Sequence, residues 1–228
     1  MTRPTWTTRL GLLAAAGAAY ATAVRPWQLR WGATCAEEVE PLPGDELLPH
    51  ARLQATRAIT IQARPCDVWP WLVQIGADKG GFYTYDALEN AFGLGIHSVA
   101  RLVSGWQHLR PGDFVAADRR RRGGWYVERL EPERTLVLWT GDPKTGWRFD
   151  GVQTPAGYTW AYVLRELPDG STRLLVRARF AYRSPLLAIP VELIELVDFV
   201  MTQRMLRGIR DRAERSAPSP VPLEGTAA

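Results

Sequence analysis

Four side chains with acid–base chemistry lie in one short stretch of the sequence: Tyr83, Tyr85, Asp86 and His97. A histidine near a carboxylate can act as a general base when burial tunes its pKa toward neutrality. No motif fixes how these groups lie relative to one another, so Asp86 and Glu89 are equally well explained as ordinary polar residues of a short helix. The stretch supplies candidates for catalysis, and the elements around it must position them.

The cysteines and histidines give no sign of a metal centre or a redox pair. Cys35 and Cys66 form no CxxC motif and no zinc-ligand spacing with the three histidines. Because these motifs are missing, we expect no metal and no cofactor. The two thiols could form a disulfide only if the chain is exported.

The composition is that of one globular domain with flanking segments. The 228 residues are 46% hydrophobic and 23% charged. The net charge of +4 is small and the arginines are spread over several predicted elements, which argues against nucleic-acid binding. The ten tryptophans are more informative, because aromatic rings bury large apolar areas and predict a large core or an aromatic-lined pocket.

The N-terminal region divides into an apolar segment and a leader. Residues 10–24 carry no charge between Arg9 and Arg25, but they are fewer than the roughly 20 residues of a membrane span. We predict that residues 1–25 are a signal anchor or signal peptide, so that the protein is membrane-associated, or cytoplasmic or exported after cleavage. The alternative is an alanine-rich helix packed on the domain. Residues 26–50 are predicted to be an extended leader.

The domain begins with a strand that runs directly into a helix. Alternation around Ile59 predicts the strand, and Pro65 suits the first position of the helix. Pro70 removes a backbone hydrogen bond and is expected to kink or split this helix. A second short helix is predicted over residues 84–92, with Thr84 as its N-cap.

Antiparallel strands occupy the middle of the chain. Alternation predicts three short strands, over residues 114–117, 125–130 and 135–140. The arginines at 119–122 mark a hairpin tip, which is either a solvated loop or a contact for anionic lipid headgroups. The long loop over residues 141–157 is a candidate lid, because its aromatic side chains, Trp147 and Phe149, need somewhere to pack.

Two longer strands follow, and each has an apolar and a polar face. The polar face of the second strand is predicted to look at water, and it carries Arg173, Arg177, Arg179 and Arg183. The apolar faces carry Tyr158, Trp160, Tyr162 and Leu164 on the first strand and Leu174, Val176, Ala178, Phe180 and Tyr182 on the second.

The chain closes with a long helix over residues 185–215. The tail, residues 216–228, is rich in proline and small residues and is predicted to be disordered. The apolar part of the helix holds Leu193, Leu196, Val197, Val200 and Met201.

The order of strand, two short helices, antiparallel strands and long helix is an α+β arrangement. The stretches TRAITIQARPCDVWPWLVQIG, GGFYTYDALEN, WQHLRPGDFV and DFVMTQRMLRGIRDRAE resemble the SRPBCC superfamily, which groups START lipid-transfer domains, the birch-pollen allergen type and the polyketide cyclases. Within it, the chain looks most similar to a bacterial branch that has an N-terminal apolar segment and no assigned chemistry. The resemblance covers residues 25–215. It implies a helix-grip fold over residues 51–215, in which a curved antiparallel sheet wraps the C-terminal helix and leaves a cavity.

The resemblance implies no catalytic residue, because the superfamily shares no catalytic motif. The helix-grip fold that the resemblance implies turns the apolar strand faces inward. We therefore expect the protein to bind a small hydrophobic molecule or lipid there, for transport or sensing, rather than to be an enzyme. One alternative is a cyclase or dehydratase that uses His97 and Asp86 on a polyketide-like substrate, and another is an interaction module with a filled cavity. The predicted ligand-binding residues are Trp160, Tyr162, Phe180, Tyr182, Val197 and Met201.

Overall fold

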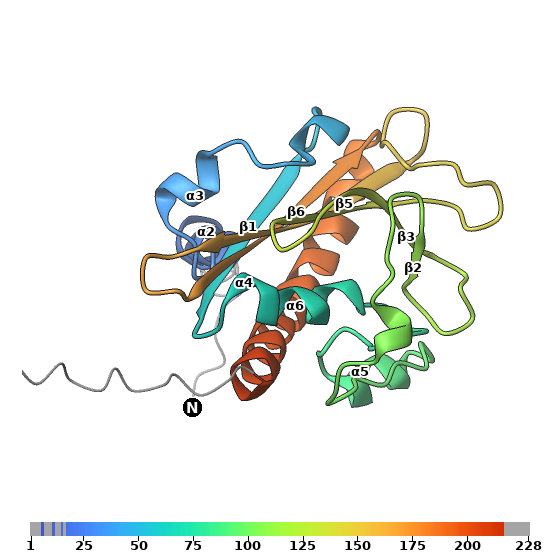
Figure 1. The fold of residues 1–228 in the computed structure, drawn as a ribbon. Coiled ribbons are helices and arrows are strands. Elements are labelled where there is room, and N and C mark those ends of the chain that lie inside the picture. The colour runs from blue at the N-terminus through green and yellow to red at the C-terminus, as the bar shows by residue number, and fades with distance from the viewer. Residues whose placement is uncertain (1–5, 7–10, 12–14, 16, 217–228) are drawn as a thin grey trace, which may run out of the picture.

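The computed structural model describes residues 6, 11, 15 and 17–216. Its centre is a six-stranded antiparallel sheet of order β1-β6-β5-β4-β3-β2, so the first and last strands of the chain pair with each other. The sheet lies over the long C-terminal helix α6, Ala188–Ser216 (Figure 1). The strands are β1 Leu53–Ile61, β2 Phe114–Ala116, β3 Gly124–Glu131, β4 Thr135–Thr140, β5 Ala156–Glu166 and β6 Thr172–Tyr182.

The prediction of an α+β helix-grip fold is confirmed. Two short helices, α4 (Pro65–Val73) and α5 (Asp86–Ala91), follow β1, and α6 lies on the inner face of the sheet. The main core lies between this face, α4 and the second half of α6, where the side chains of Met205 and Ile209 are fully buried. The core therefore fixes one half of α6 and leaves the other half to cover something else.

The two short helices differ from their predictions in detail. Pro65 is the first residue of α4, as predicted, and the helix runs through Pro70 without splitting. Helix α5 is shorter than predicted, and Thr84 does not cap it. The Thr84 hydroxyl instead donates a hydrogen bond of 2.6 Å to the carboxylate of Glu89, because the helix begins two residues later than expected.

The leader is not extended throughout. Residues 26–50 contain most of α2 (Arg25–Leu29), all of α3 (Cys35–Val39) and a 3-10 turn at Asp45–Leu47. The Thr34 hydroxyl and the Glu37 carboxylate form a reciprocal capping box at the start of α3, which gives this short helix its start signal. Helix α3 and the 3-10 turn lie on the outer side of β6, where Glu37 and Asp45 pair with Arg173 and Arg177, whereas α2 lies beside β1 and contacts α6 (Figure 1).

The prediction that the arginine face of β6 looks at water is wrong for three of its four arginines. Arg177 is 1% exposed, and Arg173 and Arg179 are mostly buried, while Arg183 is exposed. The leader covers the face, and its backbone carbonyls and carboxylates accept hydrogen bonds from the guanidinium groups. Arg177 alone donates to the carbonyls of residues 37, 38 and 40 and to Asp45.

Several predictions about the termini fall partly outside the described residues. These include most of the first half of the apolar segment 10–24 and residues 217–228 of the tail. Among the described residues, no helix combines the length and apolar character needed to cross a bilayer. Trp27 packs edge-on against Phe199 of α6, with ring centroids 5.2 Å apart, so the leader also contacts the C-terminal helix. Cys35 and Cys66 are both free thiols.

Candidate functional site: a cavity between the sheet and α6

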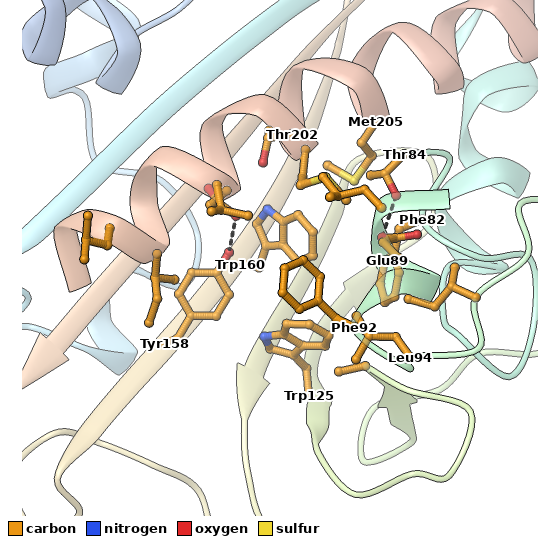
Figure 2. A pocket seen from close by; sticks show the side chains of 18 of the residues that line it. Phe82, Thr84, Glu89, Phe92, Leu94, Trp125, Tyr158, Trp160, Thr202 and Met205 are labelled. Atoms are coloured by element: carbon orange, nitrogen blue, oxygen red, sulfur yellow. Dashed lines mark hydrogen bonds between the residues drawn. The ribbon is translucent and has the colours of Figure 1, made fainter. Parts of the chain in front are cut away.

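A cavity of ≈ 740 Å³ lies between the inner face of the sheet and the first half of α6. This volume falls within the roughly 300–1,000 Å³ typical of small-molecule sites. Strands β3, β5 and β6 contribute one wall, α6 contributes the opposite wall, and α5 with the segment after it closes one end (Figure 2).

Aromatic side chains dominate the sheet wall. Trp125 on β3, Tyr158 and Trp160 on β5, and Phe180 on β6 all line the cavity, because alternate residues of a strand share a face. Tyr158 and Phe180 are direct partners in the strand register, and their ring centroids lie 4.4 Å apart. The rings of Trp125 and Trp160 are 5.5 Å apart, so the four residues form one continuous aromatic surface.

Four of the six predicted ligand-binding residues line this cavity: Trp160, Phe180, Val197 and Met201. Tyr162 points to the same side but is fully buried, and its hydroxyl donates to the Met205 sulfur over 3.6 Å. At this depth α6 has closed onto the sheet and the cavity has ended. Tyr182 lies beyond the other end of the cavity, beneath the guanidinium of Arg52.

Exposed apolar side chains surround the cavity on the α5 and α6 sides. Leu88 and Phe92 belong to α5 and its C-terminal end, and they are 43% and 73% exposed. Leu193 and Val197 on α6 are 60% and 56% exposed. All four residues also line the cavity, so it opens to solvent through an apolar rim.

Polar groups on the cavity wall are few. Glu89 is buried, and burial raises the pKa of its carboxyl above the usual range, although the hydrogen bond from Thr84 acts in the opposite direction. Glu89 Oε2, Trp125 Nε1, Trp160 Nε1 and Thr202 Oγ1 have no hydrogen-bond partner among the described residues. The wall is thus mostly apolar, and its few polar groups include paired ones, Thr84 and Asp198, as well as the unpaired atoms.

A buried charge cluster lies beside the cavity, between β1 and α6. Arg57 donates to Glu195, to Asp198 over 2.7 Å and to the backbone carbonyl of Gln28 in the leader. The hydroxyl of Tyr158 is 3.5 Å from the other oxygen of Asp198 (Figure 2). Burial raises the pKa of Glu195, and Asp198 is a second carboxylate competing for one guanidinium. The cluster therefore links the leader, the sheet and the helix at one end of the cavity.

The four acid–base candidates do not assemble into a group facing the cavity. The Asp86 carboxylate accepts hydrogen bonds from the backbone N–H and hydroxyl of Ser98, while His97 is exposed. Tyr83 is buried and donates its hydroxyl to the carbonyl of residue 71, and burial raises its pKa well above the usual range. Tyr85 lies under Arg204 on the surface. None of the four lines the cavity of the described chain.

The candidate lid, residues 141–157, does not line the main cavity. It borders a second hollow of ≈ 530 Å³, which includes Phe149 and shares Tyr158, Phe180 and Ile194 with the first. The Phe149 carbonyl accepts a 2.7 Å hydrogen bond from the Trp139 indole, so the loop is held at the C-terminal end of β4. At the hairpin tip, Arg121 and Arg122 pair with Asp78 and Asp118.

The sequence pattern does not predict all of the cavity residues. Tyr158 shares the predicted inward face of β5, so alternation alone could have included it. Trp125 begins a predicted strand whose orientation was open. Glu89 and Thr202 carry no such signal, because each is a buried polar residue of an otherwise amphipathic helix and only the packing shows where it points.

Comparisons with known proteins show likeness in structure only. No protein-family description matches the chain, and no curated protein matches it. Among solved structures, a Chromobacterium violaceum protein is 13% identical with a TM-score of 0.42, over 75% of this chain and 100% of its own. Ara h 8.0201 is 15% identical with a TM-score of 0.42, over 71% and 97%.

A third similar structure is DynU16, a protein of the dynemicin biosynthetic locus. It is 11% identical with a TM-score of 0.38, and the match covers 68% of this chain and 46% of DynU16. At these identities and scores the helix-grip assignment depends on the strand order and the helix described above.

Proposed function

We propose that the protein binds a small hydrophobic molecule in the cavity between its sheet and α6. The observation that carries the proposal is the ≈ 740 Å³ space itself, lined by a continuous aromatic surface on the sheet. A protein that used this region only as core would close it, because interiors are packed to the density of organic crystals. An aromatic wall favours a ligand that contains rings.

The apolar rim supports the same proposal. Phe92 and Leu193 are large, exposed and adjacent to the opening, and a bound molecule in the mouth would remove part of their surface from water. The rim also gives the ligand a route between α5 and the first half of α6.

The cyclase or dehydratase alternative has less support. It needs His97 and Asp86 to face a substrate, whereas His97 is exposed and Asp86 is engaged by Ser98. The other alternative, an interaction module with a filled cavity, has less support because the cavity of ≈ 740 Å³ is open. Association with a membrane through residues 10–24 stays a prediction.

Native mass spectrometry of the full chain tests the proposal. The purified protein would be mixed in turn with a tricyclic aromatic compound, a sterol and a long-chain fatty alcohol. We expect one molecule per chain for at least one class, with a rise in melting temperature that grows with ligand concentration. Absence of binding for all three classes would contradict the proposal.

A further inference from the structure

Four residues that line the cavity, Glu89, Trp125, Trp160 and Thr202, carry a polar atom that lacks a partner among the described residues, and all of them except Trp125 are buried. Glu89, Trp160 and Thr202 are 6%, 7% and 2% exposed, and their Oε2, Nε1 and Oγ1 atoms are the unpaired ones. An unsatisfied buried polar group costs about 1–3 kcal/mol, and buried polar groups nearly always have a partner. These groups come from three sides of one cavity, α5, β5 and α6, which indicates that something in the cavity completes them.

Among these residues, Glu89 has the most clearly fixed side chain. The Thr84 hydroxyl donates to Oε1 over 2.6 Å and fixes the carboxyl group, while Oε2 is left without a donor. Figure 2 shows this pair at the α5 end of the cavity, next to Phe82 and Leu94. Burial also raises the pKa of this carboxyl, as expected where no cation faces it. A ligand hydroxyl is the complementary group, because a cation would require a larger desolvation cost.

Trp160 and Thr202 form the second polar position. Trp160 extends from β5 and Thr202 from α6, and in Figure 2 the hydroxyl of Thr202 is directed toward the Trp160 ring across the cavity. An indole N–H can only donate, and a hydroxyl can donate or accept. One ligand oxygen between them would accept from both. The flexible side chains of Met201 and Met205 lie alongside and can move to admit it.

The neighbouring carboxylate of Asp198 is a poor candidate for this role. It already accepts from Arg57 over 2.7 Å, and the Tyr158 hydroxyl approaches its other oxygen. Its partners are therefore supplied by the protein, in contrast to those of Glu89 Oε2 and Trp160 Nε1.

We infer that the ligand is an uncharged, mostly apolar molecule with two oxygen functions, a hydroxyl that bonds Glu89 and an acceptor oxygen that bonds Trp160 and Thr202. The inference depends on the proposed function, since it describes what the same cavity holds. It adds that recognition is polar at two points and that the pocket discriminates among molecules of equal hydrophobicity.

Three pyrene compounds separate the two contacts. Pyrene measures apolar binding, pyrenecarboxaldehyde adds only an acceptor, and hydroxypyrene adds a hydroxyl that can donate to Glu89 or accept from Trp160 and Thr202. With the full chain, fluorescence titration should show both substituted compounds binding about tenfold more tightly than pyrene, the ratio that one charge-assisted or well-shielded hydrogen bond provides.

The variants should then act on different compounds. Glu89→Leu should reduce the preference for hydroxypyrene and keep that for the aldehyde, and Trp160→Phe should reduce the preference for the aldehyde and keep the part of the hydroxypyrene preference that Glu89 provides. Glu131→Leu, on an exposed strand end, is the control and should change neither ratio. If Glu89→Leu does not fold, Glu89→Gln keeps the side-chain size and should reduce the hydroxypyrene preference, because a neutral oxygen is a weaker acceptor.

The outcomes distinguish the inference from the proposed function. If pyrene binds but the substituted compounds show no preference, or keep it in the variants, the polar contacts are refuted and hydrophobic binding stands. If none of the three compounds binds, both the inference and the proposed function fail.

Discussion

At the scale of single residues, Arg177 shows how a charged side chain can be a structural residue of a sheet. It is buried between β6 and the leader, and its guanidinium donates to three leader carbonyls, to Asp45 and to the Thr56 hydroxyl. The carbonyl contacts explain its burial, because they satisfy the ends of short leader elements that cannot bond to themselves. The leader is therefore attached by hydrogen bonds as much as by apolar contact.

We predict that Arg177→Met destabilises the protein by about 3 kcal/mol. The new side chain would fill similar volume, but it would leave buried carbonyls and Asp45 without donors. The free energy of unfolding from urea denaturation measures the loss. Arg183→Met, at the exposed arginine of the same strand face, should change it by less than about 0.5 kcal/mol. Equal effects of the two substitutions would contradict this account of Arg177.

Glu37 makes the attachment of the leader sensitive to acid. The hydrogen bond from Arg173 lowers the pKa of its carboxyl from 4.5 to about 2, against the opposing effect of burial. A lowered folded-state pKa gives stability that is present above the unfolded value and is lost as the pH falls toward the folded value.

Glu37→Gln should therefore reduce stability at neutral pH and flatten its decline between pH 4.5 and about 2. Melting temperatures of the two proteins across this range test the prediction. Parallel curves for wild type and variant would show that Glu37 does not contribute to the acid dependence.

At the scale of elements, the contact between α6 and the loop after α4 depends on a missing side chain. A Cβ at Gly208 would lie 2.5 Å from the carbonyl oxygen of Tyr83, so the helix approaches this backbone as closely as a glycine allows. Tyr83 itself has φ of 60°, a conformation that is uncommon for a large side chain, and the contact helps to hold it there. This junction fixes the second half of α6 against the loop after α4.

Gly208→Ala should destabilise the protein, although alanine is favoured over glycine by up to about 1 kcal/mol in an unconstrained helix. The reason is the overlap with Tyr83, and we expect a net loss of about 1–3 kcal/mol. Gly105→Ala has no atom within 4 Å of the new Cβ and is the control. Thermal unfolding of both variants measures the effect, and a stabilised Gly208→Ala protein would refute the close contact.

The elements also show what the sequence can predict. Strands β3 to β6 follow from alternation, and α6 follows from its length and its apolar and charged faces, because these signals are local. The prediction that Thr84 caps α5 is wrong, because the helix begins at Asp86 and the Thr84 hydroxyl donates to the Glu89 side chain instead of accepting from a backbone N–H. The covered arginine face of β6 was missed because burial there depends on the leader, which is more than a hundred residues away in sequence.

At the scale of the whole molecule, the sheet lies between two layers of different character. The leader covers its outer face with hydrogen bonds and ion pairs, and α6 covers its inner face with an apolar surface that closes in its second half only (Figure 1). The cavity lies where the first half of α6 stands away from the inner face of the sheet. Alternation in the sequence predicts that Trp160 and Phe180 face inward. It does not predict that Tyr162 lies where α6 already packs against the sheet.

We propose that the cavity beneath the first half of α6 takes up a hydrophobic molecule, and a substitution at the cavity rim tests this most directly. Val197→Trp places a large ring in the opening, and Val39→Trp places the same ring at an exposed site on the leader helix α3.

The measurement is titration of wild type and both variants with the neutral fluorescent probe N-phenylnaphthylamine. We predict saturable binding of one probe per chain to wild type and Val39→Trp, and at least tenfold weaker binding to Val197→Trp with its melting temperature unchanged. Equal binding to all three proteins would place the probe outside the cavity and contradict the account.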